Sequence, residues 1–268
     1  MDKQSILNKY SKPEDKLLIS KMLDKIELST FKNKIENTDF LDMYQKHLLE
    51  KILKQENIEN YIISGGAEDT ERNIIIFYPE KLKVVADINY KKILPITCIR
   101  INLPKEMYSK YSHRDYLGGL MKLGIKREKI GDILVFEDGA DILILEDIEK
   151  FLLNNINALT RFGKSNIEII KLEDVREKKI NTKEIQIIIP SLRIDAVVAE
   201  LAKTSRGKAE ELLEEGRIFV NYEEIKKETK QIKENDILTI RGKGKFIIGK
   251  QEGTTKNGRV KIIVQQFV

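Results

Sequence analysis

Hydrophobic residues in the first sixty positions recur at the spacing of an α-helix. One series is Leu17, Leu18, Met22, Leu23 and Ile26, and a second is Phe40, Leu41, Tyr44, Leu48, Leu49, Ile52 and Leu53. Intervals of three and four residues place such side chains on one helix face. Thr38 or Asp39 is expected to cap the second helix, because a short side-chain oxygen can accept hydrogen bonds from the free amides of a first turn.

The hydrophobic period shortens after residue 60. Residues 61–64 and 73–78 are β-rich runs separated by Gly65 and Gly66, so two short strands are expected there. The sequence therefore predicts an N-terminal domain over residues 1–90 that is helical with short strands.

Residues 91–175 alternate between strand and helix patterns in the order β-α-β-β-α-β. The strands are expected at 96–103, 132–136, 141–145 and 167–172, and the helices near 113–123 and 146–159. This order is the ferredoxin-like arrangement that RNA-recognition-motif (RRM) domains share. The strands lack the aromatic signature with which RRM domains stack bases, so the order alone is weak evidence of RNA binding.

Residues 176–186 are charged and are expected to link this RRM-like domain to a last domain over 187–268. Apolar residues at 194, 197, 198 and 201 mark one face of a helix. Ser205 is expected to cap a second helix, and Gly216 to end it. Strands are expected at 217–221 and 236–240. The predicted fold class is therefore α+β.

Composition and cysteine usage exclude several classes of protein. The chain has 268 residues, of which 41% are hydrophobic and 34% charged, as in a soluble globular protein. It lacks both the long apolar run of a membrane span and the apolar core of a signal peptide. Cys98 is the only cysteine, and zinc-ligand spacings are absent, so we expect no metal, no cofactor, no membrane partner and a cytoplasmic location.

The positive charge is concentrated in the last domain. Residues 187–268 hold 16 Lys and Arg against 12 Asp and Glu, which places there four of the five net positive charges of the chain. From residue 241 onward, Glu252 is the only acidic residue among seven basic ones. A local basic patch on a nearly neutral protein is typical of phosphate contacts, although a solubilising surface would look the same.

Three segments of the last domain share a known pattern. Residues 192–195 read Leu-Arg-Ile-Asp, residues 204–221 read Thr-Ser-Arg-Gly-Lys-Ala-Glu-Glu-Leu-Leu-Glu-Glu-Gly-Arg-Ile-Phe-Val-Asn, and residues 235–238 read Asn-Asp-Ile-Leu. The pattern resembles the S-four RNA-binding domain, which is named after a ribosomal small-subunit protein. That family usually has glycine after the strand's Asn, where this chain has Tyr222. We favour a variant of the turn over a ring that stacks on RNA.

The resemblance and the charge pattern together predict the site. The RNA-binding residues are expected to be Arg193, Ser205, Arg206, Lys208, Arg217, Asn221, Lys243 and Lys245. Arginine forks can hold a phosphate through two hydrogen bonds, and the amides at the start of the second helix can add a phosphate site. Asp195 is expected to orient the arginines rather than to contact RNA.

His113 and Arg114 form a second candidate site, at the predicted start of a helix. They would face RNA or protein there. The competing interpretation, which we favour, is structural: Ser112 caps the helix, Asp115 interacts with its dipole and Arg114 pairs locally.

The rest of the chain narrows the resemblance. Residues 112–135 read Ser-His-Arg-Asp-Tyr-Leu-Gly-Gly-Leu-Met-Lys-Leu-Gly-Ile-Lys-Arg-Glu-Lys-Ile-Gly-Asp-Ile-Leu-Val. This segment and the order of domains resemble the YlmH family of bacterial ribosome-associated proteins over nearly the full length. The resemblance implies a non-enzymatic protein that binds the large ribosomal subunit, ribosomal RNA (rRNA) and peptidyl-tRNA in ribosome-associated quality control. Independently of the resemblance, we expect a monomer. A link of the family to cell division is less mechanistic.

An RNA-modifying enzyme with an unrecognised active site is the alternative. S-four domains also accompany pseudouridine synthases and RNA methyltransferases, which usually carry the domain at the N-terminus. The sequence before residue 187 shows neither a glycine-rich cofactor loop nor the larger β-rich catalytic domain that these enzymes need. Catalytic residues are therefore not assigned.

Overall fold

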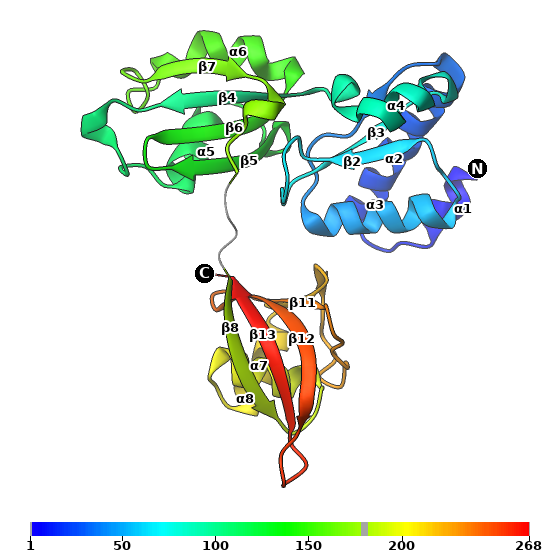
Figure 1. Ribbon diagram of the computed structural model, residues 1–268. Coiled ribbons are helices and arrows are strands. Elements are labelled where there is room, and N and C mark those ends of the chain that lie inside the picture. The colour runs from blue at the N-terminus through cyan, green and yellow to red at the C-terminus, as the bar shows by residue number, and fades with distance from the viewer. Residues whose placement is uncertain (1, 178–181, 268) are drawn as a thin grey trace. The chain divides into compact units, whose positions relative to one another are not determined.

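A computed structural model describes residues 2–177 and 182–267. The chain divides into two compact units, Met1–Lys178 and Lys179–Val268 (Figure 1). Helix and strand are mixed in both units, as the predicted α+β class requires.

The N-terminal part of the first unit packs helices on a small sheet. The apolar stripes of α2 and α3 pack against β3 in one core, which also buries Ile6 of α1 and Ile75 of β3. Strand β3 lies between β1 and β2, antiparallel to both. The elements are α1 (Lys3–Asn8), α2 (Pro13–Lys32), β1 (Glu36–Asn37), α3 (Met43–Gln55), β2 (Tyr61–Ser64), β3 (Ile74–Phe77) and α4 (Lys83–Asn89). The two helices and two strands expected here are confirmed.

The start of α3 differs from the prediction. Its cap is Asp42, not Thr38 or Asp39. The carboxylate of Asp42 accepts from the amide of Gln45 at 2.8 Å, and the Gln45 side chain accepts from the amide of Asp42 at 3.0 Å. This reciprocal pair satisfies two amides at once. Residue Leu41 is held in extended backbone by a bridge to Asn73, so the helix begins only after it.

Residues 96–170 form the predicted ferredoxin-like unit. Its antiparallel sheet has the order β5-β6-β4-β7, and helices α5 and α6 share one core with one face of that sheet. The elements are β4 (Ile96–Asn102), α5 (His113–Lys122), β5 (Ile130–Phe136), β6 (Gly139–Leu145), α6 (Glu149–Asn155) and β7 (Asn166–Ile170). Helix α6 is shorter than the predicted 146–159, because both of its ends continue as 3-10 turns.

The other face of the ferredoxin-like sheet is covered by the N-terminal part of the same unit. Ile96, Cys98 and Leu143 pack in one buried cluster with Phe40 and Ile74. The contact is close, since a Cβ added to Gly131 of β5 would lie 2.7 Å from the Phe40 ring. This is the sheet face on which RRM domains stack bases, and here it is filled with apolar side chains.

Cys98 itself is fully buried on β4. Burial raises the pKa of its thiol to about 12, and the negative charge of Asp141 adds to the rise. A thiol with so high a pKa stays protonated and unreactive at neutral pH.

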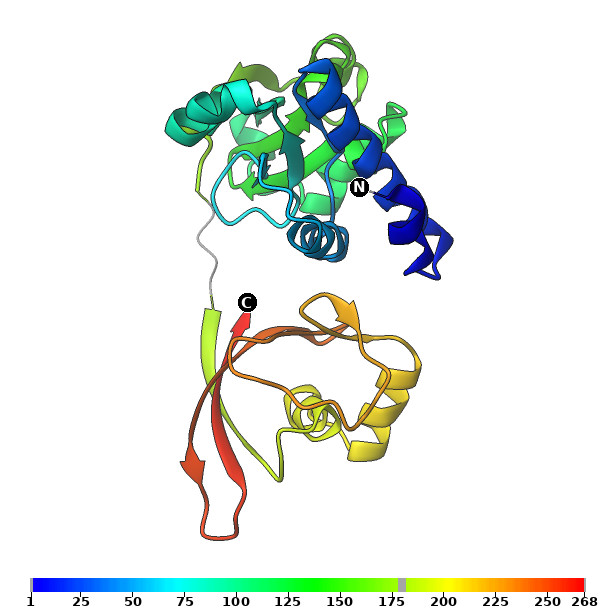
Figure 2. The same cartoon turned by 90° about the vertical axis from the view of Figure 1, so that its right-hand side faces the viewer.

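The second unit packs two helices on one curved sheet (Figures 1 and 2). Among residues 182–267, six strands form this antiparallel sheet in the order β10-β9-β11-β12-β13-β8. The elements are β8 (Thr182–Ile189), α7 (Ile194–Ala202), α8 (Arg206–Glu214), β9 (Ile218–Val220), β10 (Glu223–Glu224), β11 (Ile237–Ile240), β12 (Gly244–Thr254) and β13 (Val260–Phe267). Strand β8 begins inside the segment 176–186 that was expected to be a linker, because its residues pair with β13.

Candidate nucleic-acid interface

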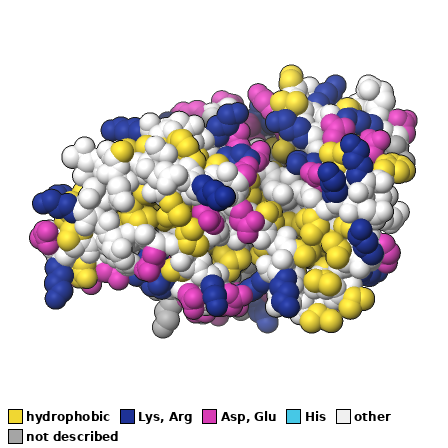
Figure 3. Space-filling model, turned by 90° about the horizontal axis from the view of Figure 1, so that it is seen from above, with side chains coloured by type: hydrophobic (Ala, Val, Ile, Leu, Met, Phe, Trp, Pro, Cys, Tyr) yellow, Lys and Arg dark blue, Asp and Glu magenta, His cyan; other side chains and the backbone are white. Residues whose placement is uncertain are grey.

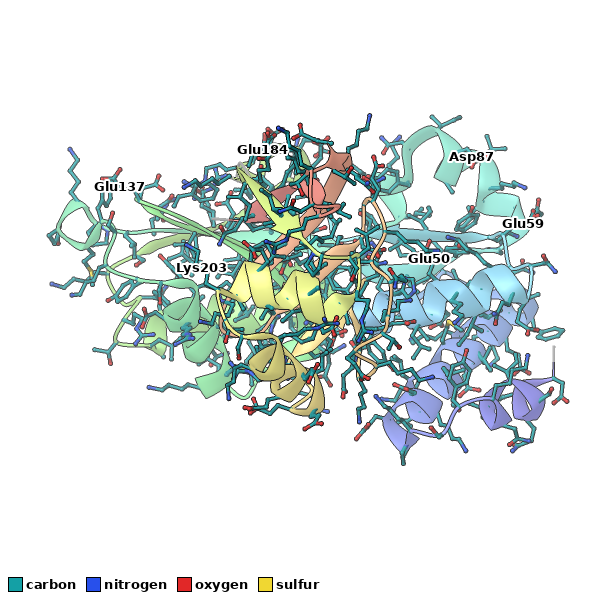
Figure 4. The ribbon with its side chains drawn as sticks, turned by 90° about the horizontal axis from the view of Figure 1, so that it is seen from below. Glu50, Glu59, Asp87, Glu137, Glu184 and Lys203 are labelled. Carbon is teal, nitrogen blue, oxygen red and sulfur yellow. The ribbon has the colours of Figure 1, made fainter. Side chains whose placement is uncertain are left out.

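Helices α7 and α8 are short, and each buries one apolar stripe against the sheet of the second unit. Val197 and Val198 of α7 lie in the same core as Leu212 and Leu213 of α8. Lys203 connects the helices in a left-handed backbone conformation with φ of 51°, which turns the chain sharply at the end of α7. Figure 4 labels Lys203 at this connection. The compact pair presents the N-terminus of α8 and the N-terminal end of α7 on one surface.

Asp195 is the centre of this surface, and its side chain is fully buried. One carboxylate oxygen accepts from Nε and Nη2 of Arg206 at 2.8 and 2.7 Å. The carboxylate also accepts from Nε and Nη2 of Arg193 at 3.2 and 2.9 Å, and from the amide of Ala196 at 2.8 Å. Both guanidinium groups are thereby fixed by one buried anion, and the expectation that Asp195 orients them without contacting RNA stays a prediction.

The hydrogen bonds keep the Asp195 carboxylate ionised. Burial raises the pKa of this group, but the bonds from Arg193, Arg206 and the Ala196 amide lower it more, so the pKa lies below its ordinary value of 3.8. The two arginines stay substantially exposed, at 33% for Arg193 and 48% for Arg206. Each guanidinium therefore keeps donor groups that face solvent, and these can reach a phosphate.

The N-terminus of α8 adds backbone donors beside Arg206. Ser205 caps the helix, and its hydroxyl accepts from the amide of Lys208 at 3.2 Å. Amides of the first helical turn have no partner inside the helix and carry a partial positive charge. The Lys208 ammonium pairs with Glu211 one turn away, which leaves it on the exposed surface.

Arg217 lies where α8 passes into β9, and it joins the helix surface to the sheet. Its Nη2 donates to the carbonyl of Arg241 at 2.8 Å, and its Nη1 lies 3.4 Å from Glu215. The Arg241 amide in turn donates to the carbonyl of Arg217 at 2.9 Å. The Arg217 side chain is 41% exposed, so it remains accessible beside the helices.

Asn221 and Tyr222 form the turn between β9 and β10. Both have positive φ, 49° and 68°, as in the two-residue hairpin turns that suit the twist of a sheet. The structure thus shows the turn variant that was favoured for Tyr222. The same turn holds the Tyr222 ring beside the Lys245 ammonium, so stacking of this ring on RNA is compatible with the turn and stays a prediction. Asn221 uses both side-chain groups inside the unit, donating to Asp236 at 2.8 Å and accepting from the Ile237 amide at 2.9 Å. Contact between Asn221 and RNA stays a prediction.

Lys243 and Lys245 lie in and after the turn between β11 and β12. Lys243 is exposed. The Lys245 ammonium lies 5.3 Å from the centre of the Tyr222 ring and 4.9 Å from that of Phe267. Arg241 makes a cation–π contact with Phe219 in the same way, with its guanidinium carbon 4.5 Å from the centre of the ring. The predicted site residues of the last domain therefore occupy the helix surface and the neighbouring end of the sheet.

His113 and Arg114 belong to the other compact unit. Both are exposed at the start of α5. The carboxylate of Asp115 accepts from the amide and the hydroxyl of Ser112, at 2.9 and 2.7 Å, and pairs with Arg161. These bonds give Ser112 and Asp115 the structural role that was favoured at the start of the helix, but the arginine that pairs with Asp115 is Arg161 and not Arg114. An RNA contact by His113 and Arg114 stays a prediction.

Sequence reasoning missed residues that support the site. The loop before β11 holds the start of α7, since the amide of Ile194 donates to the carbonyl of Lys230 at 2.8 Å and Arg193 bridges to Gln231. Phe219 and Phe267 were also missed, and only their alternation with buried neighbours could have revealed them. In residues 2–177 and 182–267 we find neither a cluster of metal-ligating side chains nor a helix able to span a membrane.

Comparisons with known proteins agree with this geometry. Residues 192–238 match the family described as "S4 domain", and residues 90–176 match the one described as "Putative RNA-binding domain in YlmH". The chain is 26% identical over 265 residues to Ribosome-associated protein quality control protein P2 of Bacillus subtilis (strain 168), covering 98% of this chain and 99% of that protein. A solved structure, the cell division protein ylmH from Streptococcus pneumoniae, is 20% identical, covers 62% of this chain and 98% of that one, and has a TM-score of 0.48.

The matched domains define an RNA-binding protein with a C-terminal S-four domain. Its domains and its full-length similarity are those of the YlmH type, so the resemblance to that family is confirmed.

Proposed function

We propose that this chain is a non-catalytic factor that binds rRNA and tRNA on the large ribosomal subunit and stabilises peptidyl-tRNA there during ribosome-associated quality control. The similarity to a quality control protein supports the process, and the two RNA-binding domain matches support the ligand. The cytoplasm is the proposed location, since translation takes place there.

The observation that carries the proposal is the arrangement of Arg193 and Arg206 around the buried carboxylate of Asp195. A buried carboxylate that binds two half-exposed arginines would preorganise them for phosphate before RNA arrives. Preorganised side chains lose less conformational entropy on binding. Phosphate contacts of this kind give affinity and position, whereas base-edge contacts give sequence preference. Such a surface suits a ligand recognised by its folded backbone, as rRNA and tRNA are.

The test is sucrose-gradient co-sedimentation of the intact chain with purified ribosomal subunits. The wild-type chain is expected to sediment with the large subunit at low salt, and Arg206→Ala is expected to weaken that binding without unfolding the unit. Lys203→Ala is the matched control, because it removes a basic side chain at the other end of α7. An Arg206→Ala chain that sediments like the wild type would refute the proposed anchor.

Non-catalytic action is tested separately. Incubation with RNA that carries tritium at C5 of uridine, or with RNA and a labelled methyl donor, is expected to release or transfer no label. Enzyme-dependent release or transfer would replace the proposal with the RNA-modifying alternative.

A further inference from the structure

The sheet of the second unit has a face that α7 and α8 do not cover. The residues that alternate with the core positions point there, and Figure 1 shows β8, β13 and β12 in front of the two helices. We use the term open face for Phe219, Tyr222, Thr239, Arg241, Lys245 and Phe267, at the end of the sheet where β9, β11, β12 and β13 lie side by side.

Rings and cations are interleaved on the open face. Arg241 lies over Phe219, and Lys245 lies between Tyr222 and Phe267. Thr239 pairs with Phe219 on one side and with Lys245 on the other, so one row crosses the strands. Neighbouring strands are about 4.8 Å apart, so the backbones at Phe219 on β9 and Phe267 on β13, three strands apart, are separated by roughly 14 Å. Unstacked bases could contact the two rings without competing for the same space.

The basic residues at this end of the sheet favour a nucleic acid as the partner. Arg241, Lys243 and Lys245 follow one another at alternate positions. The acidic residues of this face lie on the edge strands or further along β12: Glu224 of β10 lies opposite Phe219 and pairs with Lys226, Glu184 lies on β8, and Glu252 of β12 accepts from Gln186 of β8. Aromatic rings flanked by cations are the surface that single-stranded nucleic acids need, because rings stack on bases while cations neutralise phosphates.

The open face is continuous with the Asp195 surface, the name used here for the exposed and half-exposed side chains around Asp195: Arg193, Ser205, Arg206 and Lys208. Arg217 follows α8 directly and bonds to the carbonyl of Arg241, while Phe219 is only two residues further along β9. An RNA backbone held at the N-terminus of α8 could therefore pass Arg217 and reach the rings within the same unit.

We propose that the open face is a second RNA-binding surface, which stacks unpaired bases of a single-stranded RNA segment on Phe219, Tyr222 and Phe267 between Arg241 and Lys245. The inference rests on the proposed function in that it extends the same RNA-binding domain. It adds a specific ligand class, single-stranded RNA. The phosphate contacts at the helices need no unpaired bases, whereas stacking on the open face does.

The first experiment measures binding of the full chain to a fluorescein-labelled single-stranded oligouridine and to an RNA duplex of equal length. The variant Phe219→Leu/Phe267→Leu keeps apolar area and removes two rings, and Tyr222→Asn removes the third while suiting the positive φ. Each ring lost is expected to lower affinity for the single strand by about 5- to 140-fold, with little effect on the duplex. Thermal unfolding followed by circular dichroism checks that the variants fold.

A second measurement does not depend on a loss of binding. The chain contains no tryptophan, so Phe219→Trp carries a single one. Its fluorescence is expected to be quenched when oligouridine stacks on it. Phe151→Trp, at a position 47% exposed in the first unit, is the control and is expected to be unaffected. An unquenched Trp at position 219 in the RNA-bound chain would overturn the inference.

The other outcomes separate this inference from the proposed function. Ring variants that bind oligouridine like the wild type, while Arg206→Ala does not, would overturn the open face and leave the Asp195 surface standing. Ring variants that bind every RNA normally but no longer sediment with the ribosomal subunit would overturn it in favour of a protein partner. Ring variants that lose oligouridine, with a wild-type chain that ignores ribosomes, would uphold the open face and refute the proposed function.

Discussion

Single buried carboxylates organise the charged side chains of both units. Asp195 binds Arg193 and Arg206 in the second unit, and Asp141 of β6 has a comparable place in the first. Asp141 accepts from Arg100 at 2.7 and 2.8 Å and from Arg176 at 2.8 Å. An ionised group without solvent needs such partners, because an unpaired buried charge is strongly destabilising.

Asp141 gives a prediction about pH. Burial raises the pKa of this carboxyl, but hydrogen bonds from Arg100 and Arg176 lower it more, from the ordinary 3.8 to about 2. A pKa lowered by folding stabilises the folded state above pH 3.8, and that stabilisation is lost as the pH falls toward 2. Asp141→Asn is expected to cost about 1–2 kcal/mol at pH 7, allowing for solvent screening at the arginines, and little near pH 2.

Urea unfolding followed by tyrosine fluorescence measures this effect. Eight of the nine tyrosines precede residue 178, so the signal reports mainly on the first unit. Asp132→Asn is a useful comparison, because burial raises the pKa of that carboxyl, and its pH profile should differ. A loss of stability in Asp141→Asn that is the same at pH 7 and pH 2.5 would contradict the argument.

At the scale of elements, the start of α8 combines a structural cap with the proposed phosphate site. Ser205 stabilises the helix by accepting from the Lys208 amide, and the same first turn presents amides to solvent. The two roles can be separated, because an aspartate at the cap keeps the acceptor and adds a negative charge where a phosphate would bind.

Two substitutions at Ser205 test that separation. Ser205→Ala is expected to lower the stability of the second unit by about 1 kcal/mol through loss of the cap. Ser205→Asp is expected to keep that stability and yet to weaken RNA binding more than Ser205→Ala does. Thermal unfolding and a fluorescence binding titration give the two quantities. Equal RNA binding by Ser205→Asp and the wild type would show that RNA does not approach the start of α8.

The sequence predicted elements well where the signal was local. The ferredoxin-like order and the boundaries of α7 and α8 follow from periodicity, Ser205 and Gly216. Strands β8, β12 and β13 were not predicted. The partner of β8 is β13, which is distant in sequence, whereas β12 pairs with its neighbours β11 and β13 but is interrupted by Gly249 and Gly253 and by shifts in register. The cap of α3 was misplaced because Thr38 and Asp42 look alike until the bridge of Leu41 to Asn73 is known.

The covering of the ferredoxin-like sheet could not be predicted from the sequence at all. The alternation of side chains along β6 shows that Leu143 and Leu145 point to the sheet face opposite the helices. It does not show that Phe40 and Ile74 pack against them there. Similarly, the sequence supplied Asp195 and its arginines, whereas the rings of the open face appear together only when β9, β12 and β13 are aligned.

At the scale of the whole molecule, the two units differ in net charge. The first unit carries nearly balanced charge, and Figure 3 shows basic and acidic side chains intermingled over one of its faces. The second unit carries most of the net positive charge. Long-range attraction of RNA is therefore expected to come mainly from the second unit.

Salt dependence tests this division. With four to six phosphate contacts, the logarithm of the binding constant should fall with the logarithm of salt concentration with a slope of about −3 to −5. Arg206→Ala is expected to reduce the slope by about 0.7–0.9, and Phe219→Leu to leave it unchanged, because a ring neutralises no phosphate. Filter-binding titrations between 50 and 300 mM salt, roughly the range where such slopes are measured, give both values. A slope unaffected by Arg206→Ala would exclude a phosphate contact there.

The buried thiol of Cys98 makes the chain convenient for site-specific labelling. Its pKa of about 12 and its full burial protect it from maleimide dyes in the folded state. Cysteines introduced at Lys203 and Glu137, which Figure 4 places on different units, would then be the sites that react. A donor and an acceptor dye at these positions would report the distance between the units in solution, with and without RNA, in a protein that keeps its native cysteine.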